Sequence, residues 1–418
     1  MRTKTIFSRD FILVAIGRAV SAFGNQILRY ALPLYLLTQT GSAALFGSIM
    51  AVSFIPMLLL FPVGGIIADR MNKRNIMLVM DFCTAVLILL FCLLQGIVAL
   101  IPLMTVTMIL LYGIDGADKP TVKASIPALV NAEHIMRANS LVDMIDSTAS
   151  MAGPVIGGLL LSVLGLAPIL YVSIACFFAS VVLDVFIRIP HQKRQSNGNV
   201  FATGFADIKE SFGFMLKKQP VILKISVVFA LSNLLLTSLV LIGLPVIVTQ
   251  RLSLTQDTAN RLYGYAQGAI AGGAVLGGFC AGALSTKLKA KTAPFLLIGC
   301  SLCIFGCGIA LQMLSAPMAI YAVLVVCCGL LLTLHTIFQI QMVTILQLLT
   351  PSHLIGKVIS CFICVVMCTN PLGQVIYGFV FEHIGNSVYL PFYITALMMI
   401  GTSLITRRTF SGIERSLS

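Results

Sequence analysis

Residues 64–74 read Gly-Gly-Ile-Ile-Ala-Asp-Arg-Met-Asn-Lys-Arg, and this stretch decides the fold. It joins two long apolar runs, near 43–68 and 76–98, through a short turn that carries one acid and three bases. Glycines allow one helix to lie close to another, and bases in such a turn suit a membrane surface. The start of the stretch recurs 213 residues later as Gly277-Gly278-x-x-Ala281, which aligns Arg74 with Lys287. The stretch therefore predicts paired membrane helices that occur twice.

Two further correspondences support this duplication. Pro154 aligns with Pro371 at a shift of 217 residues, and Gly113 aligns with Gly329 at a shift of 216. Agreement between the three shifts indicates two parallel repeats. Duplicated halves with a binding site between them near the midplane are a known transporter plan.

The composition predicts a membrane protein. Of the 418 residues, 58% are hydrophobic and 10% are charged, whereas soluble domains carry roughly 25% charged residues. A chain this apolar cannot hide its side chains from water in one core, so lipid must cover it. The net charge of +13 does not indicate nucleic-acid binding, because the bases are spread over short loops.

The apolar runs predict an all-α membrane protein with twelve spanning helices, since a span needs about 20 mostly apolar residues. The expected spans lie near 11–37, 43–68, 76–98, 102–124, 138–164, 167–187, 221–249, 259–284, 293–314, 317–348, 356–381 and 387–406. We expect a six-helix bundle over 1–187, a cytoplasmic connector over 188–220 and a second six-helix bundle over 221–418.

The positive charges predict the orientation. Of the 27 Lys and Arg residues, only Arg251 and Arg261 fall in loops at the second end of the helices, and only Arg18, Arg29 and Lys119 fall within spans. Lys and Arg in short loops stay cytoplasmic. We therefore expect a bacterial inner-membrane protein with both termini in the cytoplasm. The first span is too long for a cleaved signal peptide.

All twelve cysteines fall in apolar runs. The spacing of Cys300, Cys303 and Cys307 resembles a metal motif, but these residues follow helical periodicity. Small residues that pack one helix against another explain this spacing better. We expect no disulfide, no metal and no cofactor.

The 64–74 stretch resembles the major facilitator signature G-x-x-x-D-R-x-x-x-R/K, which it matches at Gly65, Asp69, Arg70 and Arg74. The resemblance implies the major facilitator fold, with two six-helix halves. Asp69 can face the positive end of a helix, for which we expect the start of the 356–381 span near Gly356. The other interpretation is an ordinary positively charged loop.

Residues 153–158 in the 138–164 span resemble the G-P-x-x-G-G segment of superfamily exporters. The matching residues are Gly153, Pro154, Gly157 and Gly158. This segment permits bending and close helix contact, although a kinked packing helix would use the same residues. The wider run resembles the drug–proton antiporters that include macrolide and siderophore exporters. The resemblance fails in the 102–124 span, where many exporters have an arginine near the position of Tyr112.

Ionisable residues inside the spans are functional candidates, because each costs at least a few kcal/mol in a bilayer. The expected coupling network consists of Arg18, Asp115, Asp118, Lys119, Asp143 and Asp146. Asp115 lies closest to mid-membrane, with Lys119 one turn away and Arg18 expected to face it. Asp118 and Lys119 could instead pair and hold the fold together.

Polar residues elsewhere in the spans predict a substrate cavity. The candidates are Asn25, Gln26, Arg29, Asn233, Gln267, His335 and Gln339. Amides among Met and Phe suit a large amphipathic or apolar substrate. A packing role for His335 is the alternative to a coupling role.

These features favour a secondary transporter, with proton-coupled efflux of a drug-like or amphipathic small molecule by alternating access. The alternative is an importer or a lipid flippase on the same fold. An enzyme is not expected, because the sequence offers no nucleophile with its base. The glycines at 272–278 follow no strand and indicate helix packing rather than a nucleotide site. The expected partners are the substrate, protons and lipid, with no nucleic acid, and the chain is expected to be a monomer.

Overall fold

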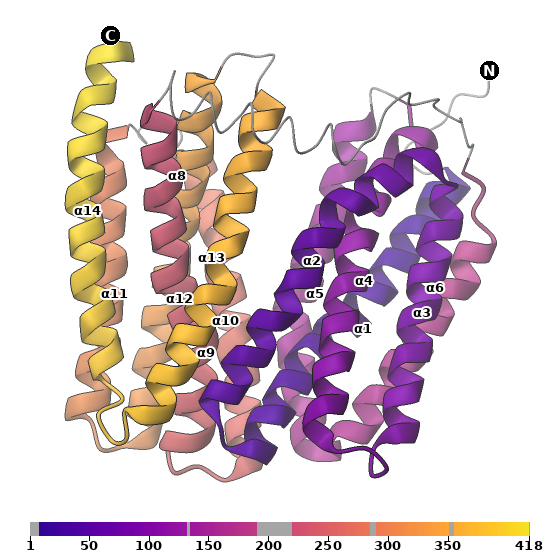
Figure 1. Cartoon of the computed structure of the whole chain (residues 1–418), viewed down its shortest axis with the longest axis horizontal. Helices are drawn as coiled ribbons and strands as arrows, with labels where there is room; N and C mark the ends of the chain where they lie inside the picture. The colour runs from indigo at the N-terminus through magenta and orange to yellow at the C-terminus, as the bar shows by residue number, and fades with distance from the viewer. Residues whose placement is uncertain (1–7, 132–133, 190–219, 285–289, 351–354, 418) are drawn as a thin grey trace. The chain divides into compact units, whose positions relative to one another are not determined.

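The computed structural model of the chain describes residues 8–131, 134–189, 220–284, 290–350 and 355–417. These residues form long helices, and the described part contains no strand (Figure 1). The helices of the first half are α1 (Arg9–Thr40), α2 (Ala43–Arg70), α3 (Lys73–Leu94), α4 (Leu100–Leu129), α5 (Ile135–Leu164) and α6 (Leu166–Val185).

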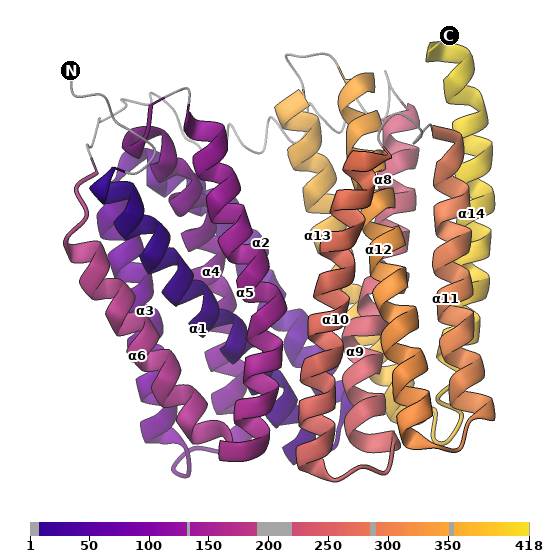
Figure 2. The same cartoon turned by 180° about the vertical axis from the view of Figure 1, so that it is seen from behind.

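One span of the second half combines α8 (Pro220–Ser232), η2 (Asn233–Thr237), α9 (Ser238–Val246) and η3 (Ile247–Arg251). The remaining elements are α10 (Gln256–Ala283), η4 (Ala290–Thr292), α11 (Ala293–Met313), α12 (Pro317–Leu349), α13 (Ile355–His383) and α14 (Leu390–Leu417), seen from behind in Figure 2. Eleven spans in the described residues are long and apolar enough to cross a membrane, and α13 is a further helix of 29 residues.

Each predicted span corresponds to a described helix, but some bounds were wrong. Helix α3 begins at Lys73 because the Asn72 side chain accepts a hydrogen bond from the Arg74 N–H. The helix ends at Leu94, and Gly96 follows in the left-handed region at φ 92°. Helix α14 continues beyond the predicted end at 406, to Leu417, because a basic helix can extend out of the lipid into water. Most of the predicted connector lies outside the described residues.

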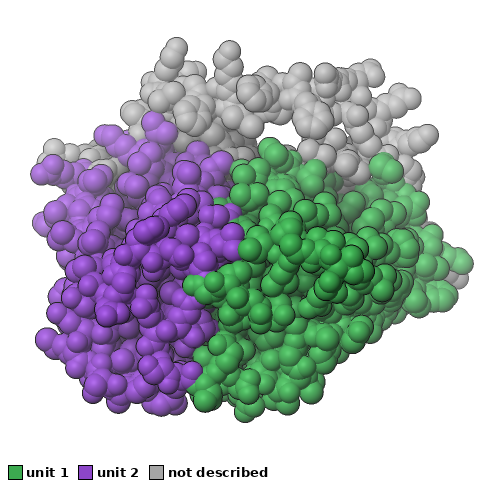
Figure 3. Space-filling model, turned by 60° about the horizontal axis from the view of Figure 1, so that its bottom comes forward, with its two compact units in different colours: residues 1–41, 49–197, 255–268 green, residues 42–48, 198–254, 269–418 purple. Residues whose placement is uncertain are grey.

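The described chain divides into two compact units. Unit 1 contains residues 1–41, 49–197 and 255–268, and unit 2 contains residues 42–48, 198–254 and 269–418 (Figure 3). The first turns of α2 thus belong to unit 2, and the first half of α10 belongs to unit 1. Within unit 1, α1 packs against α5 and α6, and α3 packs against α4 and α6. Within unit 2, α11 packs against α12 and α14.

Close helix crossings follow the sequence repeat. In unit 1, a Cβ added at Gly264 of α10 would lie 3.2 Å from the Cα of Gly158 on α5. In unit 2, a Cβ added at Gly47 of α2 would lie 3.0 Å from the Cα of Gly378 on α13. Gly47 and Gly264 are 217 residues apart, which is the shift that relates Pro154 to Pro371. Equivalent glycines therefore make equivalent helix contacts in the two units.

The glycines at 272–278 also pack helices, as predicted. A Cβ at Gly277 would lie 3.1 Å from the Cα of Thr333 on α12, and a Cβ at Gly273 would collide with the Gly329 carbonyl. In the other half, a Cβ at Gly64 of α2 would lie 2.7 Å from the Cα of Ala117 on α4. Small residues thus bring α2 to α4 and α10 to α12.

Candidate functional site

A polar cavity of about 410 Å³ lies within unit 1, between α1, α4 and α5. Its lining residues are Arg18, Ala22, Asn25, Gln26, Arg29, Asp115, Lys119, Asp143, Asp146, Ser147 and Ser150. The α1 members follow helical spacing, so they share one face of that helix. The cavity therefore gathers most of the predicted coupling network, together with three of the predicted substrate-cavity residues.

Asp115 is the most buried acid on the cavity wall, with 4% of its surface exposed. Its Oδ2 accepts hydrogen bonds from Arg29 Nη1 at 2.6 Å and from Lys119 Nζ at 2.8 Å. Asn25 Nδ2 lies 3.5 Å from the other carboxylate oxygen. One carboxylate therefore joins two cations, and Arg29, which sequence reasoning assigned to the substrate cavity, belongs to this ion-pair network.

Arg29 also lies on the ring of Tyr112, with its guanidinium carbon 3.9 Å from the ring centroid. Cation–π contacts of this kind are attractive, more so away from water. Tyr112 stands near the position where many exporters have an arginine on the fourth helix. In this chain, α1 supplies a guanidinium at that place.

A second ion-pair group surrounds Arg18, which is 7% exposed. Its Nε and Nη2 donate to the two carboxylate oxygens of Asp146, at 2.8 and 3.0 Å, and its Nη1 donates to Asp118 Oδ2 at 2.8 Å. Arg18 thus ties α1 to both α4 and α5. Such a two-pronged contact with a carboxylate is among the stronger hydrogen-bonded arrangements.

The expected pairing of Asp118 with Lys119 was wrong. Consecutive residues on a helix point in different directions, whereas residues four apart share a face. Lys119 therefore bonds to Asp115, and Asp118 bonds to Arg18. The expected hydrogen bond between Arg18 and Asp115 was also wrong, because Arg18 directs its donors to Asp118 and Asp146.

Asp143 belongs to a more exposed pair. Its carboxylate lies 3.0 Å from Lys123 Nζ, and both side chains are 56% exposed. Ion pairs with this exposure contribute about 0–1 kcal/mol. Asp143 therefore lies at the rim of the network rather than in its centre.

Sequence reasoning missed two buried acids, Asp81 on α3 and Asp184 at the end of α6, which are 9% and 1% exposed. Each is a single acid in an otherwise apolar span, and that isolation was the signal that could have found them. Asp118 is a charged neighbour of both acids, which places them behind the Arg18 group.

The predicted helix-bending segment lies on α5. A Cβ added at Gly153 would lie 2.6 Å from Gln26 Cβ on α1, and one at Gly157 would lie 3.0 Å from Cδ1 of Tyr30. Gly158 faces α10, and Pro154 lies inside the α5 helix. The segment therefore packs α5 against two helices of unit 1.

We expect Gly158→Val to destabilise the protein by about 1–3 kcal/mol, the usual cost of overpacking. An added Cβ would lie 2.8 Å from the Asn260 carbonyl oxygen and 3.0 Å from the Gly264 Cα, so the helices must separate. The measurement is the fraction that stays monodisperse after heating in detergent. Gly401→Val is the matched control, because a Cβ at Gly401 meets nothing within 4 Å. Equal melting of the two variants would contradict the prediction.

Of the signature residues, only Arg74 has a described side chain. The side chains of Asp69 and Arg70, and the environment of Gly65, lie outside the described residues, as does the expected partner region at Gly356. Arg74 donates from Nε to the main-chain oxygen of Asp184 at 3.0 Å and from Nη2 to that of Val185. It thus binds the last carbonyls of α6, where a cation is favourable.

The other predicted cavity residues lie away from the cavity. Asn233 donates to the Phe229 carbonyl, Gln267 donates to the Tyr263 hydroxyl, and Gln339 is exposed. His335 is 4% exposed, stacks on Phe229 and lies 3.3 Å from Ser232 Oγ. The environment of His335 favours the packing interpretation.

The ten cysteines that the structure describes are all free. Cys300 and Cys307 are buried in α11, and Cys300 Sγ lies 3.8 Å from the Leu331 carbonyl of α12. This contact agrees with a packing role.

Comparison with known proteins identifies the family and its nearest functional context. The Major Facilitator Superfamily model matches residues 14–368. Macrolide efflux protein A of Streptococcus pyogenes is 24% identical over 385 residues, which cover 90% of each chain. Enterobactin exporter EntS of Salmonella typhi is 24% identical over 362 residues, which cover 83% of this chain and 80% of that protein.

A solved D-xylose-proton symporter has the same fold, with a TM-score of 0.68 at 13% identity, and the match covers 93% of this chain and 96% of that one. This likeness shows the fold alone. Helical architecture, sequence repeat and family model agree with one another. The chain belongs to the major facilitator superfamily and is a multi-pass membrane transporter rather than an enzyme.

Proposed function

We propose that this transporter exports a drug-like or amphipathic small molecule in exchange for protons, by alternating access. The observation that carries the proposal is the polar cavity of unit 1, where Asp115 joins Arg29 and Lys119 inside the spanning helices. Ionisable groups at such depth are costly and usually mark substrate or proton pathways. The exporters among the relatives support efflux, and 24% identity leaves the substrate open.

In this proposal the cavity-lining acids change the charge of the site as it opens to either side. The proposed coupling residues are Arg18, Asp115, Asp118, Lys119, Asp143 and Asp146. Asp115 exchanges protons with cavity water, and the two cations beside it hold it in place. Asn25, Gln26 and Ser150 offer hydrogen bonds to a substrate from the same wall.

The proposed moving parts are the two repeats, 1–187 and 221–418, joined by a cytoplasmic connector over 188–220. Asp69, Arg70 and Arg74 are proposed to stabilise one state, and Gly153, Pro154, Gly157 and Gly158 are proposed to let α5 adjust during switching. Both termini are assigned to the cytoplasm of a bacterial cell, and the transporter is proposed to work as a monomer.

Transport in proteoliposomes tests both coupling and direction. The full-length protein is reconstituted, and uptake of a macrolide antibiotic and of enterobactin is followed under imposed pH gradients. An antiporter accumulates substrate when the lumen is acidic, because protons leave as substrate enters. Accumulation only when the outside is acidic would instead identify a proton symporter, the importer alternative that shares this fold.

A pH-sensitive dye in the lumen provides the second readout. Substrate added to liposomes without a gradient should evoke proton movement in the opposite direction. Substrate uptake without any proton movement would rule out proton coupling. Movement of labelled phospholipid between leaflets, with neither probe transported, would support the flippase alternative.

A further inference from the structure

Five ionisable side chains of unit 1 form one buried group behind the cavity, which we call the charged cluster. Its members are Arg18, Asp81, Asp118, Asp146 and Asp184. They come from five helices, α1, α3, α4, α5 and α6. The cluster contains one guanidinium and four carboxyl groups, and Arg18 spends its donors on Asp118 and Asp146. Two carboxyl groups therefore remain without a cation.

Asp81 and Asp184 are those two groups. Neither forms an ion pair with any base in the described part of the chain. Arg74 approaches Asp184 but donates to main-chain carbonyls of α6 rather than to the carboxylate. Asp184 is 1% exposed, and its Oδ2 has no hydrogen-bond partner among the described residues. A buried carboxylate without cation or hydrogen bond is expensive.

The two acids meet at the junction of α1, α3 and α6. The Ser180 hydroxyl, one turn before Asp184 on α6, is the side-chain hydrogen-bond partner of Asp81. Ser180 also lies 3.2 Å from the Gly17 carbonyl oxygen of α1. A Cβ at Gly17 would lie 3.7 Å from Asp184 Oδ1, so this carboxyl rests against the α1 backbone beside Arg18. The remaining charged neighbour of both acids is Asp118.

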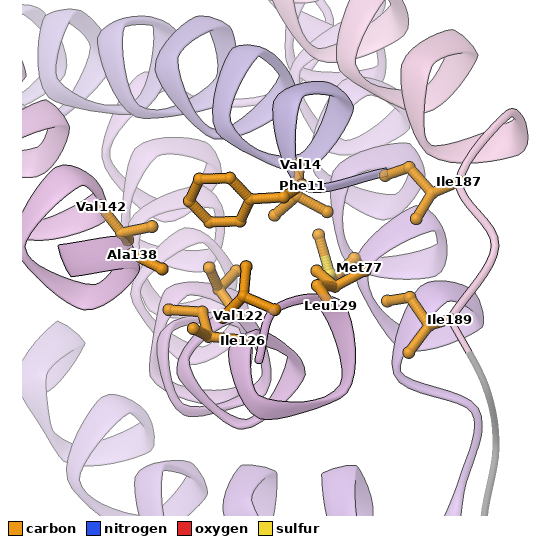
Figure 4. Packing of buried hydrophobic residues seen from close by; sticks show 11 residues of the cluster. Phe11, Val14, Met77, Val122, Ile126, Leu129, Ala138, Val142, Ile187 and Ile189 are labelled. Carbon is orange, nitrogen blue, oxygen red and sulfur yellow. The ribbon is translucent and has the colours of Figure 1, made fainter. Parts of the chain in front are cut away.

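An apolar cluster closes this junction on one side (Figure 4). Five of its members each lie three or four residues from a member of the charged cluster on the same segment. These are Val14, Met77, Val122, Val142 and Ile187. Their side chains point toward one another in Figure 4, and all are at most 7% exposed or less. The charged cluster thus faces apolar packing on that side and the polar cavity, through Arg18 and Asp146, on the other.

We propose that Asp81 and Asp184 together hold one proton, and that this is the proton the transporter moves. The second part rests on the proposed function. A shared proton removes one negative charge from a site with two carboxyl groups and no cation of its own, the arrangement in which like charges do not both ionise. On release, one carboxyl O–H bond breaks, the proton passes to water of the cavity, and a carboxylate remains beside Arg18.

A proton fits the junction better than a metal cation. Hard cations take about six or more oxygen ligands, whereas the junction offers two carboxyl groups and one hydroxyl among its described side chains. A proton needs one oxygen and one acceptor. Asp118 connects the two parts of the cluster, since it neighbours both acids and accepts from Arg18.

Infrared difference spectroscopy on the full-length protein tests the stored proton without any transport substrate. The wild type near neutral pH should show the carbonyl stretch of a protonated carboxylic acid, which shifts in heavy water. Asp184→Asn and Asp81→Asn should each remove this band, whereas Asp257→Asn, at an exposed acid of α10, should keep it. A wild type without the band overturns the proposal, and so does a band that survives both substitutions. If one variant folds poorly, the other still decides.

Two further measurements complete the test. Loss of the band on adding sodium chloride, against choline chloride at the same pH, would identify a metal-cation site and overturn the proposal. In proteoliposomes, Asp184→Asn should lose at least tenfold in substrate-evoked proton movement and keep substrate exchange. Full proton movement in that variant would overturn the coupling role. A wild type with the band but without any substrate-evoked proton movement would instead contradict the proposed function alone.

Discussion

Replacing Arg18 with methionine is expected to destabilise the protein by roughly 3–5 kcal/mol, the cost of removing one partner from a buried ion pair. Arg18 makes three hydrogen bonds, two to Asp146 and one to Asp118, and joins α1, α4 and α5. Without the guanidinium, the charged cluster keeps its four carboxyl groups and no cation. The measurement is the fraction that stays monodisperse after heating in detergent.

Two companion variants separate charge from geometry. Arg18→Lys keeps the charge but cannot bind Asp146 through two parallel hydrogen bonds, so an intermediate loss is expected. The combined change Arg18→Met, Asp118→Asn and Asp146→Asn removes both charges along with their partner, and should recover much of the stability. It should not recover transport. Arg18→Met with wild-type stability would show that the hydrogen bonds of Arg18 do not hold these helices together.

The sequence was sufficient for the fold because the membrane limits what a chain can form. Backbone groups in lipid must be satisfied within helices, so each long apolar run became a helix. Repeated glycines at matched shifts also anticipated the paired crossings of α2 with α4 and of α10 with α12. Errors at helix ends came from local capping, such as that of Asn72, and from α14, which continues past its apolar part.

The candidate site could be predicted only in part. The face of α1 that carries Arg18 and Arg29 follows from helical spacing, and both residues do line the cavity. Their partners depend on how α1 lies against α4 and α5, which no spacing within one helix reveals. For the same reason Asp81 and Asp184 passed as isolated polar residues. Their shared location appears only when α3 and α6 are packed against α1.

The second large effect is expected from Asp115→Asn, which should abolish accumulation driven by a pH gradient and leave exchange of substrate without a gradient largely intact. Asp115 accepts hydrogen bonds from Arg29 and Lys119 through one oxygen, and an amide keeps the shape while removing the charge. The site can then no longer alternate between protonated and ionised forms as it opens to either side. Asp257→Asn is the matched exposed control.

The stability of this variant decides between coupling and a structural role. Arg29 and Lys119 are 15% and 32% exposed and border the cavity, so water can solvate them once Asp115 is neutral. The loss should therefore be smaller than for Arg18→Met. If Asp115→Asn folds poorly, the added change Lys119→Gln restores the net charge of the Asp115 group and gives a second test of accumulation.

The carboxylic-acid band adds an independent criterion. It should persist in Asp115→Asn, because Asp81 and Asp184 are unchanged, while proton-driven accumulation is lost. Loss of both would place the stored proton on Asp115 itself. A well-folded variant that still accumulates substrate against its gradient would exclude Asp115 from coupling, because no other change in that variant could replace the missing charge.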